Sequence, residues 1–270
     1  MNLTFIGGGN MASALIGGLV NDGVDARGFR VVEPIAAQQD RLVSRFPGIG
    51  IFADATAGAI VGADLVMLAV KPQQMREAAE AIAPFVADVP VVMSIAAGTR
   101  IANLVQWLGG YSRIVRAMPN TPALVGAGVS GAYAPPDVSA ASRTLAGSVL
   151  EAAGTVVWVD REEMLDAVTG VSGSGPAYVF YFLEGLEQAA RELGFSPADA
   201  RTLSYGTFAG AIKLANASEL EPGILRAQVT SKNGTTERAL VKMESQHMKA
   251  NFIAAVKAAT ERARELGEGK

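Results

Sequence analysis

The chain has 270 residues, of which 50% are hydrophobic and 18% are charged, and its formal net charge is −3. This composition predicts a folded protein with a sizeable core, and it does not favour nucleic acid as a partner. Because there is no cysteine and only one histidine, His247, disulfides, thiolate metal sites, cysteine nucleophiles and multi-histidine zinc sites are excluded. We expect no metal centre, and chemistry that rests on a bound organic cofactor.

Residues 1 to about 160 alternate short apolar runs with helical patterns. Predicted strands cover residues 3–6, 29–33, 51–53, 65–70, 91–94 and 113–117, and predicted helices cover 11–20, 36–45, 73–83 and 101–108. Strand-like pieces at 128–134 and 156–159 flank a helical stretch around 139–152 and are candidates to extend the sheet. Val-, Ile- and Leu-rich strands separated by helices indicate a parallel sheet with both faces covered. We therefore expect an α/β domain with a Rossmann-type, doubly wound sheet.

After Asp160 the strand signals nearly vanish and long helical patterns follow. Ser174-Gly175-Pro176 predicts a helix start, with proline where its missing N–H costs little. Later helices are predicted to start at Ser196-Pro197 and Glu221-Pro222, and a last helix covers roughly 247–266. We place the domain boundary near residue 160, with domains at 1–160 and 161–270, the second of them all-helical.

The apolar runs are much shorter than a membrane span, and no charged and apolar leader precedes the strand at 3–6. We therefore expect a cytoplasmic protein with no membrane partner.

A glycine-rich motif, Gly7-Gly8-Gly9-Asn10-Met11-Ala12, follows the first predicted strand and opens a helix. This is the G-x-G-x-x-A form of the dinucleotide fingerprint in the context that supports it. Gly7 permits the tight turn, Gly9 lets a pyrophosphate approach the backbone, and the helix N-terminus favours the phosphates. A tight turn that binds nothing is the alternative. The motif predicts that residues 1–160 form a dinucleotide-binding domain.

Glu33 lies at the end of the second predicted strand. An acid there usually binds the adenosine ribose 2′-hydroxyl and repels a 2′-phosphate, which gives NADH serious weight as the cofactor. The alternative is a glutamate that faces solvent at a strand end.

Three further segments follow predicted strands, at the edge where doubly wound sheets bind ligands. They are Val70-Lys71-Pro72, Ser94-Ile95-Ala96-Ala97-Gly98 and Arg116-Ala117-Met118-Pro119-Asn120-Thr121-Pro122. Small and rich in exposed backbone, they suit a nicotinamide ring and its ribose. An ordinary surface lysine remains the alternative for Lys71.

Several motifs occur together in one order along the chain. Gly9-Asn10-Met11, Val70-Lys71-Pro72, residues 94–98, residues 118–123 and residues 171–178 are followed by Val229-Thr230-Ser231-Lys232-Asn233-Gly234-Thr235-Thr236. Over nearly the whole chain this set resembles the pyrroline-5-carboxylate reductases, and the last segment resembles their signature loop. That loop usually reads Ser-Pro-Gly-Gly-Thr-Thr, so Lys232 and Asn233 are departures. Asn tolerates a left-handed backbone, which lets the turn survive.

The resemblance implies a reductase that transfers hydride from NADPH or NADH to 1-pyrroline-5-carboxylate and forms proline, the last step of proline biosynthesis. It implies that Thr236 hydrogen-bonds the substrate ring nitrogen and that backbone N–H groups near it hold the substrate carboxylate. The implied substrate contacts are Met118, Ser174, Val229, Gly234, Thr235 and Thr236. The family commonly uses NADPH, with small polar residues near position 33, and Thr56 stands where an asparagine is expected near the adenosine. The implied cofactor contacts are Gly7, Gly8, Gly9, Asn10, Met11, Glu33, Thr56, Ala69, Val70, Lys71, Pro72, Ala96, Ala97, Gly98 and Asn120.

Alternatives remain open at this point. Thr235 and Thr236 are also good helix caps. Another imine or 2-hydroxy-acid reductase of the same two-domain design would share the glycine motif and the helical second half, but would not need the loop at 229–236. A nucleotide-sensing binding protein without turnover would need the glycine motif but not the segment at 118–121 or the threonine pair.

The run Tyr178-Val179-Phe180-Tyr181-Phe182-Leu183 puts apolar side chains on every side of a predicted helix. A helical domain of this length has little depth in which to bury a helix on all faces. We expect burial against a second copy, and the resemblance likewise implies a homodimer through the helical domain. A larger ring of such dimers is a further expectation.

Overall fold

The computed structural model describes residues 1–269, which form two compact units. Unit 1 contains Met1–Ser174 together with the chain from Ala258 onwards, and unit 2 contains Gly175–Lys257. The predicted change near residue 160, from alternating strands and helices to helices alone, coincides with the end of the last strand. The compact units divide later, because a short helix and a π-helical turn after that strand still pack in unit 1.

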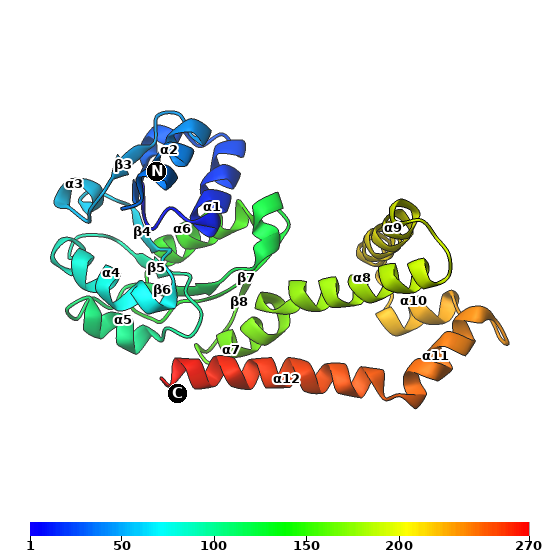
Figure 1. The fold of residues 1–270 in the computed structure, drawn as a ribbon. Coiled ribbons are helices and arrows are strands. Elements are labelled where there is room, and N and C mark those ends of the chain that lie inside the picture. The colour runs from blue at the N-terminus through cyan, green and yellow to red at the C-terminus, as the bar shows by residue number, and fades with distance from the viewer. Residues whose placement is uncertain (270) are drawn as a thin grey trace. The chain divides into compact units, whose positions relative to one another are not determined.

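An eight-stranded sheet forms the centre of unit 1, in the order β3-β2-β1-β4-β5-β6-β7-β8 (Figure 1). Neighbouring strands are parallel except β6 and β7, which are antiparallel. The strands are β1 (Leu3–Ile6), β2 (Phe29–Val32), β3 (Gly50–Phe52), β4 (Leu65–Leu68), β5 (Val92–Ser94), β6 (Ile114–Met118), β7 (Gly128–Tyr133) and β8 (Gly154–Trp158). The predicted doubly wound sheet is confirmed, and the two strand-like pieces after residue 127 extend it.

Strand β7 runs against β6 because the connection between them is too short for a parallel crossover. The connection from β6 to β7 consists mainly of one 3-10 segment, η4 (Thr121–Val125), which ends at Gly126 in the left-handed conformation. The connection from β7 to β8 contains a full helix, and this pair is parallel again.

Helices cover both faces of the sheet. The core on one face includes side chains from α1, α2 and α6, and the core on the other face includes side chains from α3, α4 and α5. Helix α3, which is only four residues long, was not predicted. Up to Ser174, the α-helices of unit 1 are α1 (Asn10–Asn21), α2 (Ala36–Arg45), α3 (Ala57–Ile60), α4 (Met75–Ile82), α5 (Ile101–Trp107), α6 (Ala140–Glu151) and α7 (Met164–Val168). The π-helical turn η5 (Thr169–Gly173) follows α7.

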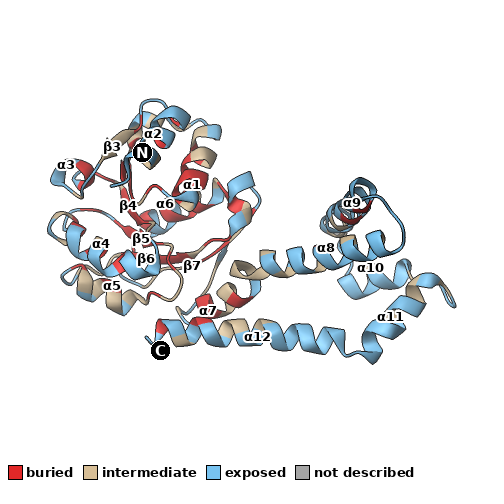
Figure 2. Cartoon of the chain, viewed as in Figure 1, coloured by how far each residue is buried: buried red, intermediate tan, exposed pale blue. Residues whose placement is uncertain are grey.

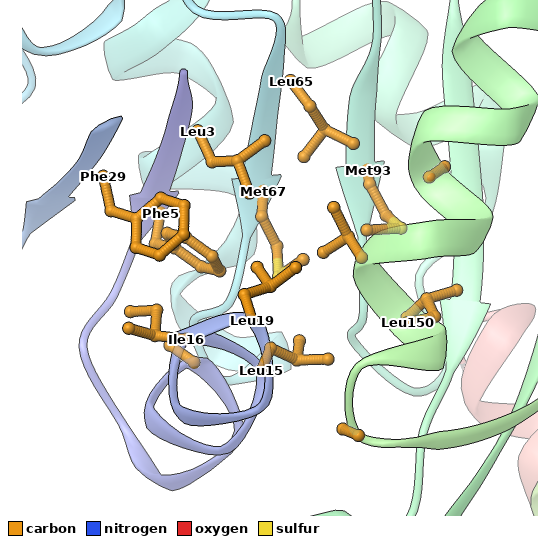
Figure 3. Close-up of a cluster of buried hydrophobic side chains, with 14 of the residues drawn as sticks. Leu3, Phe5, Leu15, Ile16, Leu19, Phe29, Leu65, Met67, Met93 and Leu150 are labelled. Atoms are coloured by element: carbon orange, nitrogen blue, oxygen red, sulfur yellow. The ribbon is translucent and has the colours of Figure 1, made fainter. Parts of the chain in front are cut away.

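Successive residues of the central strands point to opposite faces of the sheet, as the pleat requires. Leu3 and Phe5 of β1 enter one core, whereas Ile6 enters the other. Figure 3 shows the first of these cores, where the rings of Phe5 and Phe29 meet edge to face with centroids 6.3 Å apart. Because both faces are buried, the strands contain almost uninterrupted apolar residues, which is why they could be predicted.

Unit 2 is helical and has very little interior of its own. It contains α8 (Gly175–Glu192), α9 (Pro197–Asn216), α10 (Pro222–Gln228), α11 (Thr235–Ser245) and the first part of α12 (Met248–Gly267). Only Leu183, Ala200 and Ser204 are buried among its described residues, and the ribbon of these helices is almost entirely exposed in Figure 2. No helix within residues 1–269 is long and apolar enough to cross a membrane.

Candidate active site

The glycine turn after β1 is shaped by close backbone contacts. Gly7 has a φ of 99°, and a Cβ there would lie 3.0 Å from the Ala69 carbonyl oxygen. Its N–H donates to the carbonyl oxygen of Val32 at 2.8 Å, which ties the turn to β2. A side chain at this position would meet both strain and backbone, so the turn requires glycine here.

Gly9 stands at the N-cap of α1 and faces open space. A Cβ on Gly9 would have no neighbour within 4 Å, in contrast to Gly7 and Gly8. The first intrahelical bond runs from Ser13 N to Gly9 O, so the N–H groups of Asn10, Met11 and Ala12 precede it. Open space beside free N–H groups at a helix N-terminus fits a pyrophosphate group. The residues present therefore fit a dinucleotide.

The Glu33 carboxylate is buried against the glycine turn and is only 7% exposed. One oxygen accepts the N–H of Gly8 and the other accepts the N–H of Ile35, each at 3.0 Å. The side-chain amide of Gln38 also donates to the Gly8 carbonyl oxygen, at 2.6 Å. These contacts hold the acid in one place at the end of β2, with unused lone pairs on both oxygens. The alternative of a glutamate that faces solvent is wrong.

The other segments predicted to contact the cofactor follow β4, β5 and β6. These strands lie side by side with β1 in the sheet and run parallel to it, so their carboxyl ends share one edge. The topology thus brings the glycine turn, residues 69–72, residues 96–98 and residues 118–120 to one side of the sheet. In the sheet, β2 and β3 lie on one side of β1, whereas β4, β5 and β6 lie on its other side. The strand order therefore reverses at β1, and doubly wound sheets bind ligands at such a switch point.

Some predicted cofactor residues are held by the protein and others are open to solvent. Lys71 and Thr56 are exposed, and each is an N-cap residue without a side-chain capping bond. Ala69 donates its N–H to Ile6 O at 2.8 Å, and Ala96 is buried. Gly98 has a φ of 72°, which is a further glycine-dependent turn.

Asn120 is a bridge between three segments. Its side-chain nitrogen donates to the carbonyl oxygen of Ser172 at 3.0 Å, and its side-chain oxygen accepts the N–H of Val129 at 2.8 Å. Next to this bridge the Met118 side chain packs on Gly173, where a Cβ would lie 2.7 Å from the Met118 methyl carbon. Ser174, the residue that ends the π-helical turn, donates its N–H to Thr169 O. Met118, Asn120 and Ser174 therefore belong to one connected group within unit 1.

Sequence reasoning missed a cluster of charges in unit 1, made of the buried residues Arg116 and Asp166 and the half-buried residues Arg100 and Glu162. Arg116 is 2% exposed and pairs with Glu162 at 2.9 Å, while Arg100 pairs with Asp166 at 2.6 Å. Arg116, which lies inside the strand predicted at 113–117, was the available signal, because a charge in a strand covered on both faces is buried only when it is paired.

In unit 2 the loop at 229–236 leads into helix α11. Thr235 and Thr236 are the first two residues of that helix, and its N-cap is Gly234. The threonines are therefore not N-cap residues, which removes the capping alternative. The first intrahelical bond joins Arg238 N to Gly234 O, so the N–H groups of Thr235, Thr236 and Glu237 precede it. Thr235 is exposed and Thr236 is half-buried.

The loop keeps its turn despite its unusual residues. Asn233 has a φ of 61°, the left-handed conformation that its residue type tolerates. Its N–H donates to the Glu237 carboxylate at 2.6 Å, a contact that the sequence reasoning missed although an acid in the first turn of a helix is a familiar signal. Val229 and Lys232 are exposed.

Comparison with known proteins adds a consistent set of similarities. Residues 162–266 match the family model of pyrroline-5-carboxylate reductase dimerisation, and residues 2–98 match that of NADP oxidoreductase, coenzyme F420-dependent. A pyrroline-5-carboxylate reductase of Pseudomonas aeruginosa is 44% identical over 266 residues, which cover 98% of this chain and 97% of the relative. The structure of a pyrroline-5-carboxylate reductase from Coxiella burnetii aligns with a TM-score of 0.92 at 39% identity over 98% of both chains. A pyrroline carboxylate reductase of Plasmodium falciparum with NADP bound aligns with a TM-score of 0.87 at 26% identity over 99% of this chain and 98% of that one.

Proposed function

The chain belongs to the pyrroline-5-carboxylate reductase family, and from this premise we propose that unit 1 holds the dinucleotide and that the loop at 229–236 holds the substrate. The chain is an oxidoreductase that reduces the C=N bond of 1-pyrroline-5-carboxylate and forms proline. The observation that carries the substrate assignment is the start of α11, where free N–H groups and the half-buried residue Thr236 follow the loop directly.

The bound dinucleotide supplies a hydride to the imine carbon, so the chain's own residues need only orient the ring and hold its charges. The N–H groups of Thr235 and Thr236 donate to the substrate carboxylate, which the N-terminus of α11 also favours electrostatically. The Thr236 hydroxyl oxygen accepts a hydrogen bond from the protonated ring nitrogen. An alcohol is too weak an acid to protonate the ring, so Thr236 positions the substrate. Gly234 and Val229 shape the loop, and Met118 and Ser174 are proposed substrate contacts in unit 1.

For the dinucleotide, the proposed contacts are the glycine turn and the segments after β4, β5 and β6. The pyrophosphate binds at Gly9, where there is open space at the start of α1. Thr56, which is exposed, is proposed to reach the adenosine part. Lys71, also exposed, belongs to the segment that is proposed to lie at the nicotinamide ring and its ribose. The residues proposed as cofactor contacts are Gly7, Gly8, Gly9, Asn10, Met11, Glu33, Thr56, Ala69, Val70, Lys71, Pro72, Ala96, Ala97, Gly98 and Asn120.

We propose that NADH serves at least as well as NADPH, because of Glu33. Its carboxylate is fixed by two backbone N–H groups and cannot swing away without leaving them unpaired. The remaining lone pairs suit the two ribose hydroxyls of NADH, whereas a 2′-phosphate would meet a negative charge at close range. The match to an NADP oxidoreductase model instead supports a preference for NADPH. The ratio of kcat/KM for NADH and NADPH tests the proposal.

We also propose a homodimer formed through unit 2. The exposed apolar side chains on α8 include Val179, Phe180 and Tyr181, and the dimerisation model matches this part of the chain. Removing them from water against a second copy would supply the interior that unit 2 lacks. A larger ring of dimers and a cytoplasmic location stay predictions.

A spectrophotometric assay tests the function. Purified protein is mixed with 1-pyrroline-5-carboxylate and either NADH or NADPH, and both cofactor oxidation and proline formation are followed. Turnover with the cyclic imine, and none with 2-oxo acids as the matched substrates, is expected. A folded sample that binds the cofactor but reduces only 2-oxo acids would assign the other reductase class, and one that reduces neither would contradict the proposal.

A further inference from the structure

Four charged side chains in unit 1 form a compact, nearly buried ion cluster. Arg116 on β6 pairs with Glu162 at 2.9 Å and lies 3.9 Å from Asp166, and Arg100 pairs with Asp166 at 2.6 Å. Glu162 also accepts the N–H of Ile101 at 2.9 Å through the oxygen that faces Arg116. The end of α12 covers the cluster, because a Cβ on Gly267 would lie 2.7 Å from the Arg100 Nε atom.

The cluster joins the segments proposed to surround the nicotinamide half of the cofactor. Arg100 comes two residues after Gly98, and Arg116 comes two residues before Met118. The acids lie on the opposite side, next to and within α7. This helix leads directly into the π-helical turn that carries Ser172 and is followed by Ser174. Asn120 bonds to Ser172 from the same strand end. Movement of either acid would therefore shift both segments at the sheet edge, residues 96–98 and residues 118–120.

The two guanidinium groups make the acids necessary for this arrangement. Burial lowers the pKa of Arg116, and the nearby charge of Arg100 acts in the same direction, whereas Glu162 and Asp166 act against both effects. If one carboxylate became neutral, two close positive charges would lose half of their compensation in a site with little water. Arg116 of β6 and Arg100, which follows the segment at 96–98, would then be pushed apart.

Stability alone does not explain such a cluster. Buried ion pairs often contribute no more to stability than well-packed apolar residues would, so the role of this cluster is sought in the geometry that it fixes. The cluster is also incompletely bonded, since Asp166 Oδ1 and Arg100 Nη1 are both buried without a hydrogen-bond partner among the described residues.

We propose that Glu162 and Asp166 are positioning residues for the reduction: through Arg116 and Arg100 they hold the segments at 96–98 and 118–120 in the arrangement that the nicotinamide ring requires. The inference rests on the proposed function, because the reaction is the reason that the ring must be held. Neither acid touches the substrate or the cofactor, and both act through the loops.

The test compares Glu162→Gln and Asp166→Asn with Glu163→Gln, an exposed neighbour that is the matched control. Glu162→Gln keeps an acceptor for Ile101 and changes only the charge, so it stays informative if Asp166→Asn does not fold. Each folded variant is titrated with NADH and with ADP-ribose, which is the dinucleotide without its nicotinamide ring. Steady-state kinetics with NADH and with its 4-deuterated form give kcat, KM and the isotope effect.

We expect Glu162→Gln and Asp166→Asn to lower kcat about 10- to 100-fold, because misplacement of about 1 Å has effects of this size. The isotope effect should rise, and affinity for NADH should fall while affinity for ADP-ribose stays the same. Equal losses for NADH and ADP-ribose, an unchanged kcat per folded site, or the same losses in Glu163→Gln would overturn the proposal. If the wild type does not reduce the imine, the proposed function fails, yet the two affinities still test whether the acids position the ring site.

Discussion

Unit 1 and unit 2 contain similar kinds of apolar residues but use them differently. In unit 1 the side chains of β1, β4 and β5 are removed from water by helices of the same chain. In unit 2, Phe180 remains 62% exposed and Tyr181 73% exposed, on a helix whose only buried side chain is Leu183. Unit 1 removes its apolar side chains from water within one chain. Unit 2 leaves apolar side chains in water, and contact with another surface would bury them. Apolar content alone therefore does not tell whether a segment belongs to a core or to an interface.

The largest effect is expected from a charge on the exposed face of unit 2. If Phe180 is buried in a dimer, Phe180→Asp loses about 3–5 kcal/mol of packing in each copy, and the carboxylate adds a desolvation cost. Light scattering should then show a monomer where the wild type is a dimer. The control is Val43→Asp on α2 of unit 1, which is 50% exposed and should leave the mass unchanged. A fully active wild-type species with the 27.9 kDa mass of one chain would refute the dimer.

A cavity in unit 1 should act within a single copy. Leu15 of α1 is fully buried against the sheet, so Leu15→Ala is expected to lower the free energy of unfolding by about 2–5 kcal/mol. Val43→Ala, on the exposed side of the same unit, should change it by less than about 0.5 kcal/mol. Urea unfolding at two protein concentrations measures both. Equal losses for the two variants would mean that unit 1 does not have the separate core described above.

Thr236→Ala tests whether substrate binding belongs to unit 2. The loss of one hydrogen bond to a charged group should cost about 1.5–3 kcal/mol in kcat/KM for the imine. Dinucleotide affinity should stay nearly unchanged, because the glycine turn lies in unit 1. Thr236→Ser, which keeps the hydroxyl, should retain most of the activity. If the steady-state kinetics of Thr236→Ala match the wild type, the threonine only supports the helix.

The smallest effect is expected at Glu33 of unit 1, as a change of cofactor preference. Glu33→Ser should weaken NADH and improve NADPH in relative terms, by about 1.4 kcal/mol or tenfold. Glu33→Gln is the matched variant, since it keeps the length and one acceptor oxygen but removes the charge. The ratio of kcat/KM for the two cofactors measures the effect, while KM for the imine should be unchanged. A wild type that already strongly prefers NADPH would show that Glu33 does not contact the ribose.

Elements that are buried on both sides were predictable, and elements that depend on neighbours were not. The strands at β1, β2 and β4 were found because parallel strands covered by helices are apolar throughout. The antiparallel direction of β7 was not, although the short connection at η4 contained the reason. At the candidate site, the glycine turn could be predicted because Gly7 and Gly9 act through their own backbone. The two backbone bonds of the Glu33 carboxylate could not, since its partners are Gly8, from another strand end, and Ile35.

The sequence by itself determined the doubly wound sheet, the dinucleotide motif and the left-handed turn at Asn233, because each depends on short stretches of chain whose conformations are set locally. It also determined the family, because several such motifs occur together in one order. Tertiary structure decided which residues meet. It brought Arg100 and Arg116 to the acids at 162 and 166, joined Asn120 to Ser172, and left the apolar side of α8 in contact with solvent. Such contacts join residues far apart in the chain, and their geometry follows from packing of the whole unit.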